Sequence, residues 1–150
     1  MGLRNAEPGS NYVPAYQVSG IPSALTLTSL VADRPIRVDF PSVTRWIIIS
    51  AAEDSKINAE IKIAFSEHGI NGVEQDNFFI LPLSSLVDTA LTDGVSIVSP
   101  VIEVRCKSIW VMATTNNIAA VSILAGVTGI NNSKLPILSG SVRAGQTGIG

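Results

Sequence analysis

Short runs in which apolar and polar residues alternate one by one constrain this chain more than any other feature. Successive side chains of a β-strand point to opposite faces, so this period of two places every apolar side chain on one face. The run Ile36–Phe40 has the pattern, with Arg37 and Asp39 between its apolar residues, and Ile61–Phe65 and Val101–Lys107 repeat it. The alternation therefore predicts half-buried β-strands that share a core.

Further apolar runs, separated by turn residues, extend this prediction along the chain. The run Val43–Ser50 is apolar on both faces at its end, which is typical of an interior strand, and Pro82 favours an edge position or a strand exit. The run Ile118–Ala125 also fits an amphipathic helix, but the glycines that follow favour a strand. About eight short strands without a long helix predict two packed β-sheets, with a closed barrel as the alternative. The remaining predicted strands are Ala24–Val31, Asn77–Leu83 and Val95–Val98, together with Ser108–Ala113, which either continues the run Val101–Lys107 or forms the next strand.

The two ends of the chain lack this alternation. We interpret residues 1–20 as an N-terminal arm and residues 131–150 as a C-terminal arm of a β-sandwich domain that spans residues 21–130. A purely solvated tail has little use for apolar side chains, so those in the arms are expected to contact neighbouring subunits. The alternative, that they fold back on their own subunit, stays open. The candidate assembly contacts are Tyr12, Tyr16, Leu135 and Ile137.

Charge is scarce and evenly spread. Charged residues make up 15% of the chain, against about 25% in an ordinary soluble domain, and the formal net charge is −2. Nucleic-acid binders carry a basic field, so we expect no direct nucleic-acid partner, and without an apolar run of about 18 residues we expect no membrane span. Little polar material remains to cover the surface, which predicts either partners that hide part of it or a neutral exterior over a well-filled core.

The residue types that carry chemistry are few. His68, the one histidine, follows Glu67, and such a pair can be half of a catalytic triad, but the remaining parts of a hydrolase are missing. Zinc needs three or four ligands, and His68 and Cys106 supply two. The acidic pairs Glu53–Asp54 and Glu74–Asp76 lack the spacing of a calcium loop. We therefore expect no catalytic residue, no metal and no cofactor, and we do not expect an enzyme.

Several other residues carry structural expectations. Cys106, the one cysteine, cannot form an intrachain disulfide, and it shares a face of its run with Ile102, which predicts a buried thiol. Trp46 and Trp110 lie within predicted strands and are expected in the core. The turn residues in His68–Gly72 predict a loop.

Four stretches together carry a family resemblance. They are Val38–Trp46, Phe65–Gly72, Asn77–Leu83 and Glu103–Trp110. With these stretches in this order, and with arms at both ends, the chain resembles the small single jelly-roll capsid proteins of icosahedral double-stranded DNA viruses, among them vertex (penton) and minor capsid proteins. The resemblance covers residues 21–130, and capsid decoration proteins share the same pattern.

This resemblance implies an all-β fold, a single jelly-roll β-sandwich of about eight strands with extended N- and C-terminal arms. It implies a structural protein of the virion whose partners are other capsid proteins and copies of itself. Five copies would close a vertex, or three would surround a local threefold axis. Two other hypotheses remain: a carbohydrate- or receptor-binding sandwich of a viral fibre or capsid decoration, and an enzyme or cupin-like metal protein built around His68.

Overall fold

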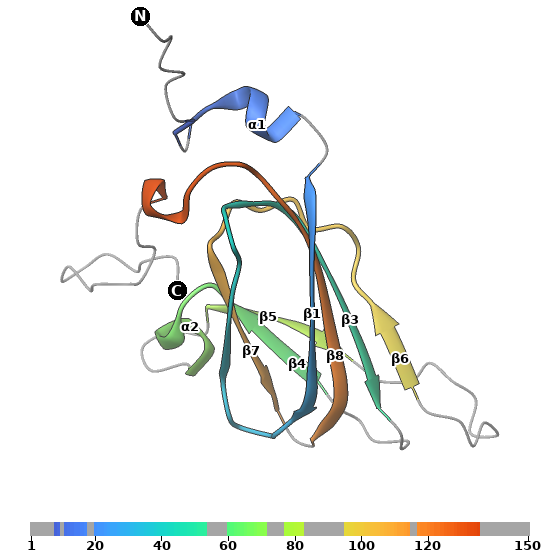
Figure 1. Cartoon of the computed structure of the whole chain (residues 1–150). Coiled ribbons are helices and arrows are strands. Elements are labelled where there is room, and N and C mark those ends of the chain that lie inside the picture. Colours follow the sequence, from blue (N-terminus) through green and yellow to red (C-terminus); the bar gives the residue numbers. More distant parts are fainter. Residues whose placement is uncertain are drawn as a thin grey trace, which may run out of the picture.

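A computed structural model describes residues 8–9, 11–17, 20–53, 60–71, 77–82, 95–114 and 117–135. Within these residues, eight strands form two antiparallel sheets of four strands each. Sheet A has the order β1 (Ile21–Leu30), β8 (Ile118–Val127), β3 (Thr44–Glu53) and β6 (Val95–Val98). Sheet B has the order β2 (Ile36–Asp39), β7 (Ser108–Ala113), β4 (Glu60–Ala64) and β5 (Phe78–Pro82). The helices are α1 (Val13–Gln17), α2 (Glu67–Asn71) and the 3₁₀ turn η1 (Asn132–Lys134) (Figure 1).

The order of the strands is that of a jelly roll. Each strand before the connection between β4 and β5 pairs with the strand that lies the same number of strands after it. The pairs are β1–β8, β2–β7, β3–β6 and β4–β5. The chain is thus a long double ribbon that folds over itself into two sheets, as jelly rolls are. This arrangement confirms the predicted all-β sandwich, and the position of β3 between β8 and β6 confirms that it is an interior strand. Pro82 ends the edge strand β5, as predicted.

β-Branched side chains from both sheets fill the space between them. Ile47, Ile49 and Ile123 project from sheet A, and Ile61 and Ile63 from sheet B, and all five are buried in one cluster. Branching at Cβ suits these residues to the pleated surface of a strand. The inward positions of Ile61 and Ile63 are those that the alternation predicted. The other large members of the cluster are Leu30, Val38, Phe40, Leu81, Ile109, Val111, Ile118, Val121 and Val127.

The strand predicted over Val101–Lys107 is absent, although its alternation is real. Cys106 is buried and Ile102 is half-buried, while Val101, Glu103 and Arg105 are exposed. The segment carries the chain from β6 in sheet A to β7 in sheet B, so it cannot keep one neighbouring strand. It pairs with Ile47 at the single bridge of Ile102. Further along, Thr44 substitutes for a partner strand: its Oγ1 donates to the Val104 carbonyl at 2.6 Å and accepts the Cys106 N–H at 3.0 Å.

The loop predicted at His68–Gly72 is also wrong, because residues 67–71 form α2. The N-terminal end of this helix is capped by Ser66, whose Oγ accepts the Gly69 N–H at 3.0 Å. Its buried residue Ile70 packs with Ala64 and Met112 on the outer side of sheet B. The turn residues therefore form a helical turn because a cap and an apolar anchor are available.

Both tryptophans lie outside the space between the sheets, contrary to the prediction that they belong to the core. Trp110 is half-buried against the cluster of Ala64, Ile70 and Met112 under α2. Trp46 is half-buried on the outer side of sheet A, where it covers Gly126. A ring of this size finds more room on an outer face than between sheets that pack about 10 Å apart.

We predict that two neighbouring isoleucines of β3 differ sharply in their effect on stability. Ile49→Ala removes a side chain that is 0% exposed in the core, and this should lower the free energy of unfolding by about 2–5 kcal/mol. Ile48, the next residue, is half-buried on the outer face, so Ile48→Ala should cost clearly less. Urea titration of the two variants measures the difference, and equal losses would contradict the assignment of the two faces.

A second prediction concerns the pH dependence of stability. Burial raises the pKa of the Cys106 thiol from 9.0 to about 11, against a smaller opposing effect of the hydrogen bond with Thr44. Because the unfolded chain loses this proton at a lower pH than the folded chain, stability falls as pH rises from about 9 to about 11. The difference in unfolding free energy between wild type and Cys106→Ala should shrink by about 2–3 kcal/mol over this range. Urea titrations of both proteins from pH 8 to pH 11 measure it, and a constant difference would argue against the burial of the thiol.

Candidate assembly surface

The outer face of sheet A consists of the residues that alternate with its core residues. On β8, the buried residues Val121, Ile123 and Ala125 point toward sheet B, so the residues between them point outward. The strand registers then define one outer row for each strand. The rows are Pro22, Ala24, Thr26 and Thr28 on β1; Ala120, Ser122, Leu124 and Gly126 on β8; Trp46, Ile48, Ser50 and Ala52 on β3; and Ser96 and Val98 on β6.

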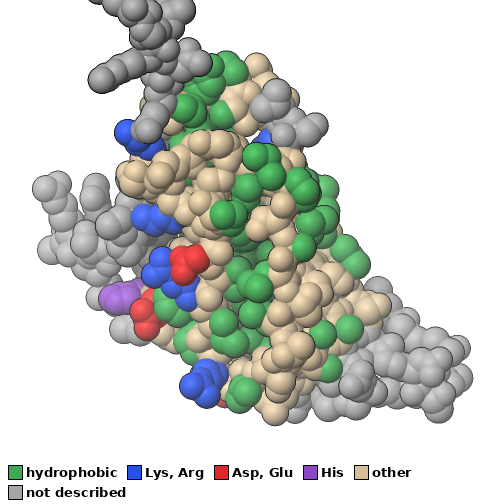
Figure 2. Space-filling model, viewed as in Figure 1, with side chains coloured by type: hydrophobic (Ala, Val, Ile, Leu, Met, Phe, Trp, Pro, Cys, Tyr) green, Lys and Arg blue, Asp and Glu red, His purple; other side chains and the backbone are tan. Residues whose placement is uncertain are grey.

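None of these outward residues carries a charge. A sheet with one solvated face normally places polar, often charged side chains outward, whereas this face alternates apolar residues with serine and threonine. Leu124 and Val98 are 40% and 62% exposed. The charged side chains visible in Figure 2 lie mainly on the β2 side of the molecule, and hydrophobic and uncharged side chains cover the β1 side. We call this surface the uncharged face.

The outer face of sheet B is different in kind. It carries the ion pair Arg37–Asp39, whose nitrogen and oxygen atoms lie 2.8 Å apart, and Lys62, whose Nζ lies 4.3 Å from the ring centroid of Phe78. Part of it lies under α2. Both sheets contribute to the core but only sheet A has an outer face without charge, so the lack of charge is a property of one face and not of the whole fold.

One pair of hydroxyl groups on the uncharged face is satisfied within the face, and one glycine permits a close contact between strands. The hydroxyl groups of Thr26 and Ser122 lie 3.1 Å apart across β1 and β8 and share a hydrogen bond. Gly126 leaves room for the indole of Trp46, because a β-carbon at residue 126 would overlap that ring. Polar groups that already have partners lose little when water is removed, so this hydroxyl pair suits burial against another protein.

β1 forms one edge of sheet A and has an unusual inner side. Ile21 and Leu25 lie directly opposite the buried residues Val127 and Ile123 of β8, so they point to the same, inner face. They are nevertheless 62% and 44% exposed. The strand therefore leaves apolar side chains uncovered at the open side of the sandwich, next to the uncharged face.

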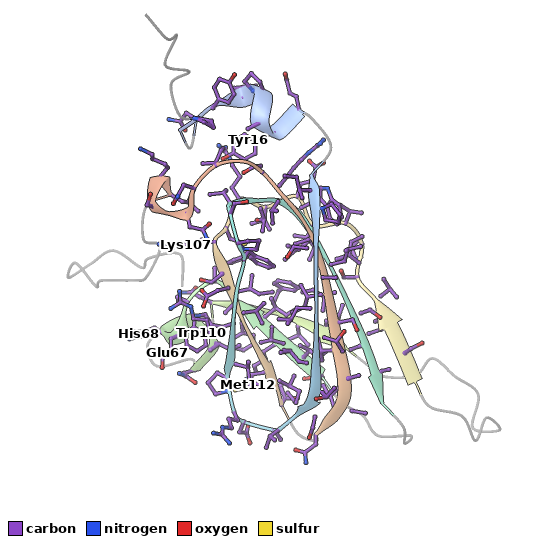
Figure 3. The ribbon with its side chains drawn as sticks, in the orientation of Figure 1. Tyr16, Glu67, His68, Lys107, Trp110 and Met112 are labelled. Carbon is purple, nitrogen blue, oxygen red and sulfur yellow. The ribbon has the colours of Figure 1, made fainter. Side chains whose placement is uncertain are left out.

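Three of the four residues proposed from the sequence as assembly contacts, Tyr12, Tyr16 and Leu135, lie at one end of the sandwich, where α1 and η1 are found (Figure 1). Tyr12 precedes α1 and is 51% exposed. Tyr16 lies on α1 against its own subunit, with the Arg105 guanidinium 4.9 Å from its ring centroid (Figure 3). Leu135 follows η1 and is half-buried, and Ile137 lies outside the described residues. Their contacts with other subunits stay a prediction.

α1 borders an open cleft of about 380 Å³ at this end. Val13 and Tyr16 line it from the helix, and Arg45 and Arg105 line it from the sandwich. No residue of α1 is buried, so this helix rests on the sandwich without entering the core. Pro14 is the second residue of this short helix, where a missing N–H costs no hydrogen bond.

The residues considered for catalysis and metal binding do not come together in the part of the chain that is described. His68 and Glu67 are both exposed on α2, away from the space between the sheets (Figure 3). Among the described residues, no three histidine, cysteine, aspartate or glutamate side chains form a group that could hold a metal ion. The acidic residues 54, 74 and 76 lie outside the described residues, as does the side chain of Glu53. The helices within the described ranges are also too short to cross a bilayer.

Sequence reasoning did not single out the uncharged face. Its signal was nevertheless present in the runs Ala24–Val31 and Ile118–Ala125, where alanine, serine and threonine take the positions that an exposed strand usually gives to charged residues. The registers were needed to show that these rows lie side by side.

Comparison with known proteins adds little to this geometry. No protein-family model matches the chain, and no curated protein matches it. Among solved structures, the chain is similar to the crystal structure of infectious bursal disease virus VP2 subviral particle, with 13% identity and a TM-score of 0.32. The match covers 89% of this chain and 38% of that chain, so this chain spans less than half the length of its structural neighbour. A TM-score this low carries no argument, and the function must be inferred from the geometry.

The contact between Gly126 and Trp46 yields a prediction. Gly126→Ala places a methyl group where the indole lies, which should lower the free energy of unfolding by about 1–3 kcal/mol through overpacking. Gly129→Ala is the matched control, since a β-carbon there has nothing within 4 Å, and it should change stability little. Thermal unfolding followed by tryptophan fluorescence measures both. Equal stability of the two variants would show that Trp46 does not cover Gly126.

Proposed function

We propose that this chain is a structural subunit of a viral capsid and that it assembles through the uncharged face of sheet A. The jelly roll alone does not decide this, because viral capsid domains, lectin domains and cupins all use it. The observation that carries the proposal is the absence of charge from every outward row of one sheet, while the other sheet has charged residues. The centres of protein interfaces are depleted of charged residues in the same way.

The dimensions of the uncharged face support a role in stable assembly. Strands of ten residues are about 33 Å long, and neighbouring strands lie about 4.8 Å apart. Three such strands and the shorter β6 therefore offer about 540 Å² for one partner. A standard interface buries about 800 Å² on each partner, so this face can supply most of one specific contact, with the arms as a source of the rest.

The resemblance of the chain to small single jelly-roll capsid proteins supports the virion as the place of assembly. On this proposal the subunit occupies a vertex or serves as a minor capsid or decoration protein, with five or three copies arranged around a symmetry axis. Cyclic assemblies of this kind join one surface of a subunit to a different surface of the next. The uncharged face supplies one of these surfaces, and its partners are other capsid proteins or further copies of this chain.

We predict that one charge on the uncharged face prevents assembly. Leu124→Lys introduces an ammonium group that stays solvated in the free subunit but loses its water in an interface, where an unpaired charge costs several kcal/mol. Size-exclusion chromatography with light scattering should show oligomers for the wild type and a monomer for Leu124→Lys at equal concentration. An image of the wild-type assembly by electron microscopy then gives its symmetry.

Ile80→Lys is the matched control for this experiment. Ile80 is 46% exposed, close to the 40% of Leu124, and it lies opposite Lys62 on the outer face of sheet B. The Ile80→Lys variant should assemble like the wild type. Both variants should keep the wild-type melting temperature within a few degrees. A wild-type chain that stays monomeric at high concentration and is also absent from purified particles would refute the proposal, and so would equal assembly of the Leu124→Lys and Ile80→Lys variants.

A further inference from the structure

We infer that β1 pairs edge to edge with β1 of a second copy, antiparallel and about a two-fold axis near Leu25, so that the two A sheets become one continuous sheet. This inference rests on the proposed function, because it assigns a second contact to a chain that assembles with itself. The first observation behind it is the position of β1 at the edge of sheet A. One side of an edge strand presents unpaired backbone N–H and C=O groups, which are a template for another strand.

β1 lacks most of the features that protect edge strands. Natural edges are usually short or carry charged residues, especially lysine, whereas β1 has ten residues and no charge. In the described part of the chain, its backbone hydrogen bonds are those with β8. The irregular features lie near its two ends: Pro22 lacks an N–H, and Ser29 has a positive φ of 62° and no partner in the register with β8. The stretch Ser23–Thr28 is left regular and open.

Pairing of two β1 strands would bury apolar side chains on the inner side of β1 that are exposed in the single subunit. Leu25 points inward but is 44% exposed, and Ile21 is 62% exposed. With a two-fold axis near Leu25, directly opposite residues of the two strands lie on the same face. The leucines of the two copies then cover each other, and the uncharged faces of both copies join into one wider surface.

The absence of charge allows the second strand to be another copy of β1. About a two-fold axis at Leu25, this residue faces its own copy and Ala24 faces Thr26 of the other copy. Like charges at such positions would repel each other, and β1 carries none. A two-fold arrangement also closes after two copies, whereas a head-to-tail arrangement of edges would continue into a fibre. Pro22 and Ser29 limit the contact to about six residues, or about 20 Å, so it is too small for a stable dimer alone. It adds to the larger contact of the uncharged face.

Single cysteines at residues 24, 25, 26 and 27 in a Cys106→Ala background test the inference. Directly opposite residues in an antiparallel pair lie 4.5–5.5 Å apart at Cα, which a disulfide can bridge. At assembly concentration, one of these positions should form a disulfide dimer under mild oxidation at least ten times faster than the positions next to it. Mass spectrometry should identify the link between two β1 peptides. Cysteine at residue 80 is the control for random collision and should link slowly.

Hydrogen exchange of residues 21–30 provides an independent readout. The amide protons of β1 that point away from β8 should exchange quickly in dilute monomer and at least tenfold more slowly in the assembly. The Leu25→Lys variant should lose this protection. If the wild type assembles but β1 neither crosslinks nor gains protection, the inference fails while the proposed function stands. Protection already present in the monomer would show that another segment of the same chain covers β1, and this also refutes the inference. A wild type that never assembles refutes both.

Discussion

The band of β-branched side chains between the two sheets is the interaction on which everything else in this molecule depends. Ile49 and Ile123 from sheet A meet Ile61 and Ile63 from sheet B, and all four are completely buried. Because successive side chains of a strand point to opposite faces, the need for apolar side chains in the core fixes the type of every second residue and leaves the residues between them free to differ. On sheet B those residues include an ion pair and a helix-covered cluster, and on sheet A they form an uncharged surface. The core is therefore shared, while the two outer faces have separate roles.

Most strands could be predicted from the sequence because their signal is local, as in Ile36–Phe40. The order of strands could not, since β1 pairs with a strand about one hundred residues away and no local pattern encodes that partner. The error at Val101–Lys107 has the same origin. Alternation reports that one side of a segment is buried, but it does not report whether a neighbouring strand exists. There the Thr44 side chain provides the hydrogen bonds that a strand would give.

The tryptophans and the candidate site show a second limit. Where both sides of a strand are apolar, as around Trp46, composition cannot tell which side faces the core. The register decides it, because Trp46 lies opposite Gly126, a residue of the outer row. The aromatic residues of the N-terminal arm attracted attention because they stand out against a polar segment. The uncharged face went unnoticed because each alanine or serine in it is unremarkable alone, and its meaning appears only when four strands lie side by side.

A face that lacks charge but contains hydroxyl groups and small side chains has a physical advantage over a strongly apolar one. Large apolar patches and open edges lead free subunits to aggregate. Thr26 and Ser122 satisfy each other, and Pro22 and Ser29 interrupt the two ends of β1, so a free subunit offers only modest contacts. Modest contacts become strong when several form at once, because each one raises the effective concentration of the next. On the proposed assembly, a subunit built in this way binds firmly only when its face and its edge meet their partners together.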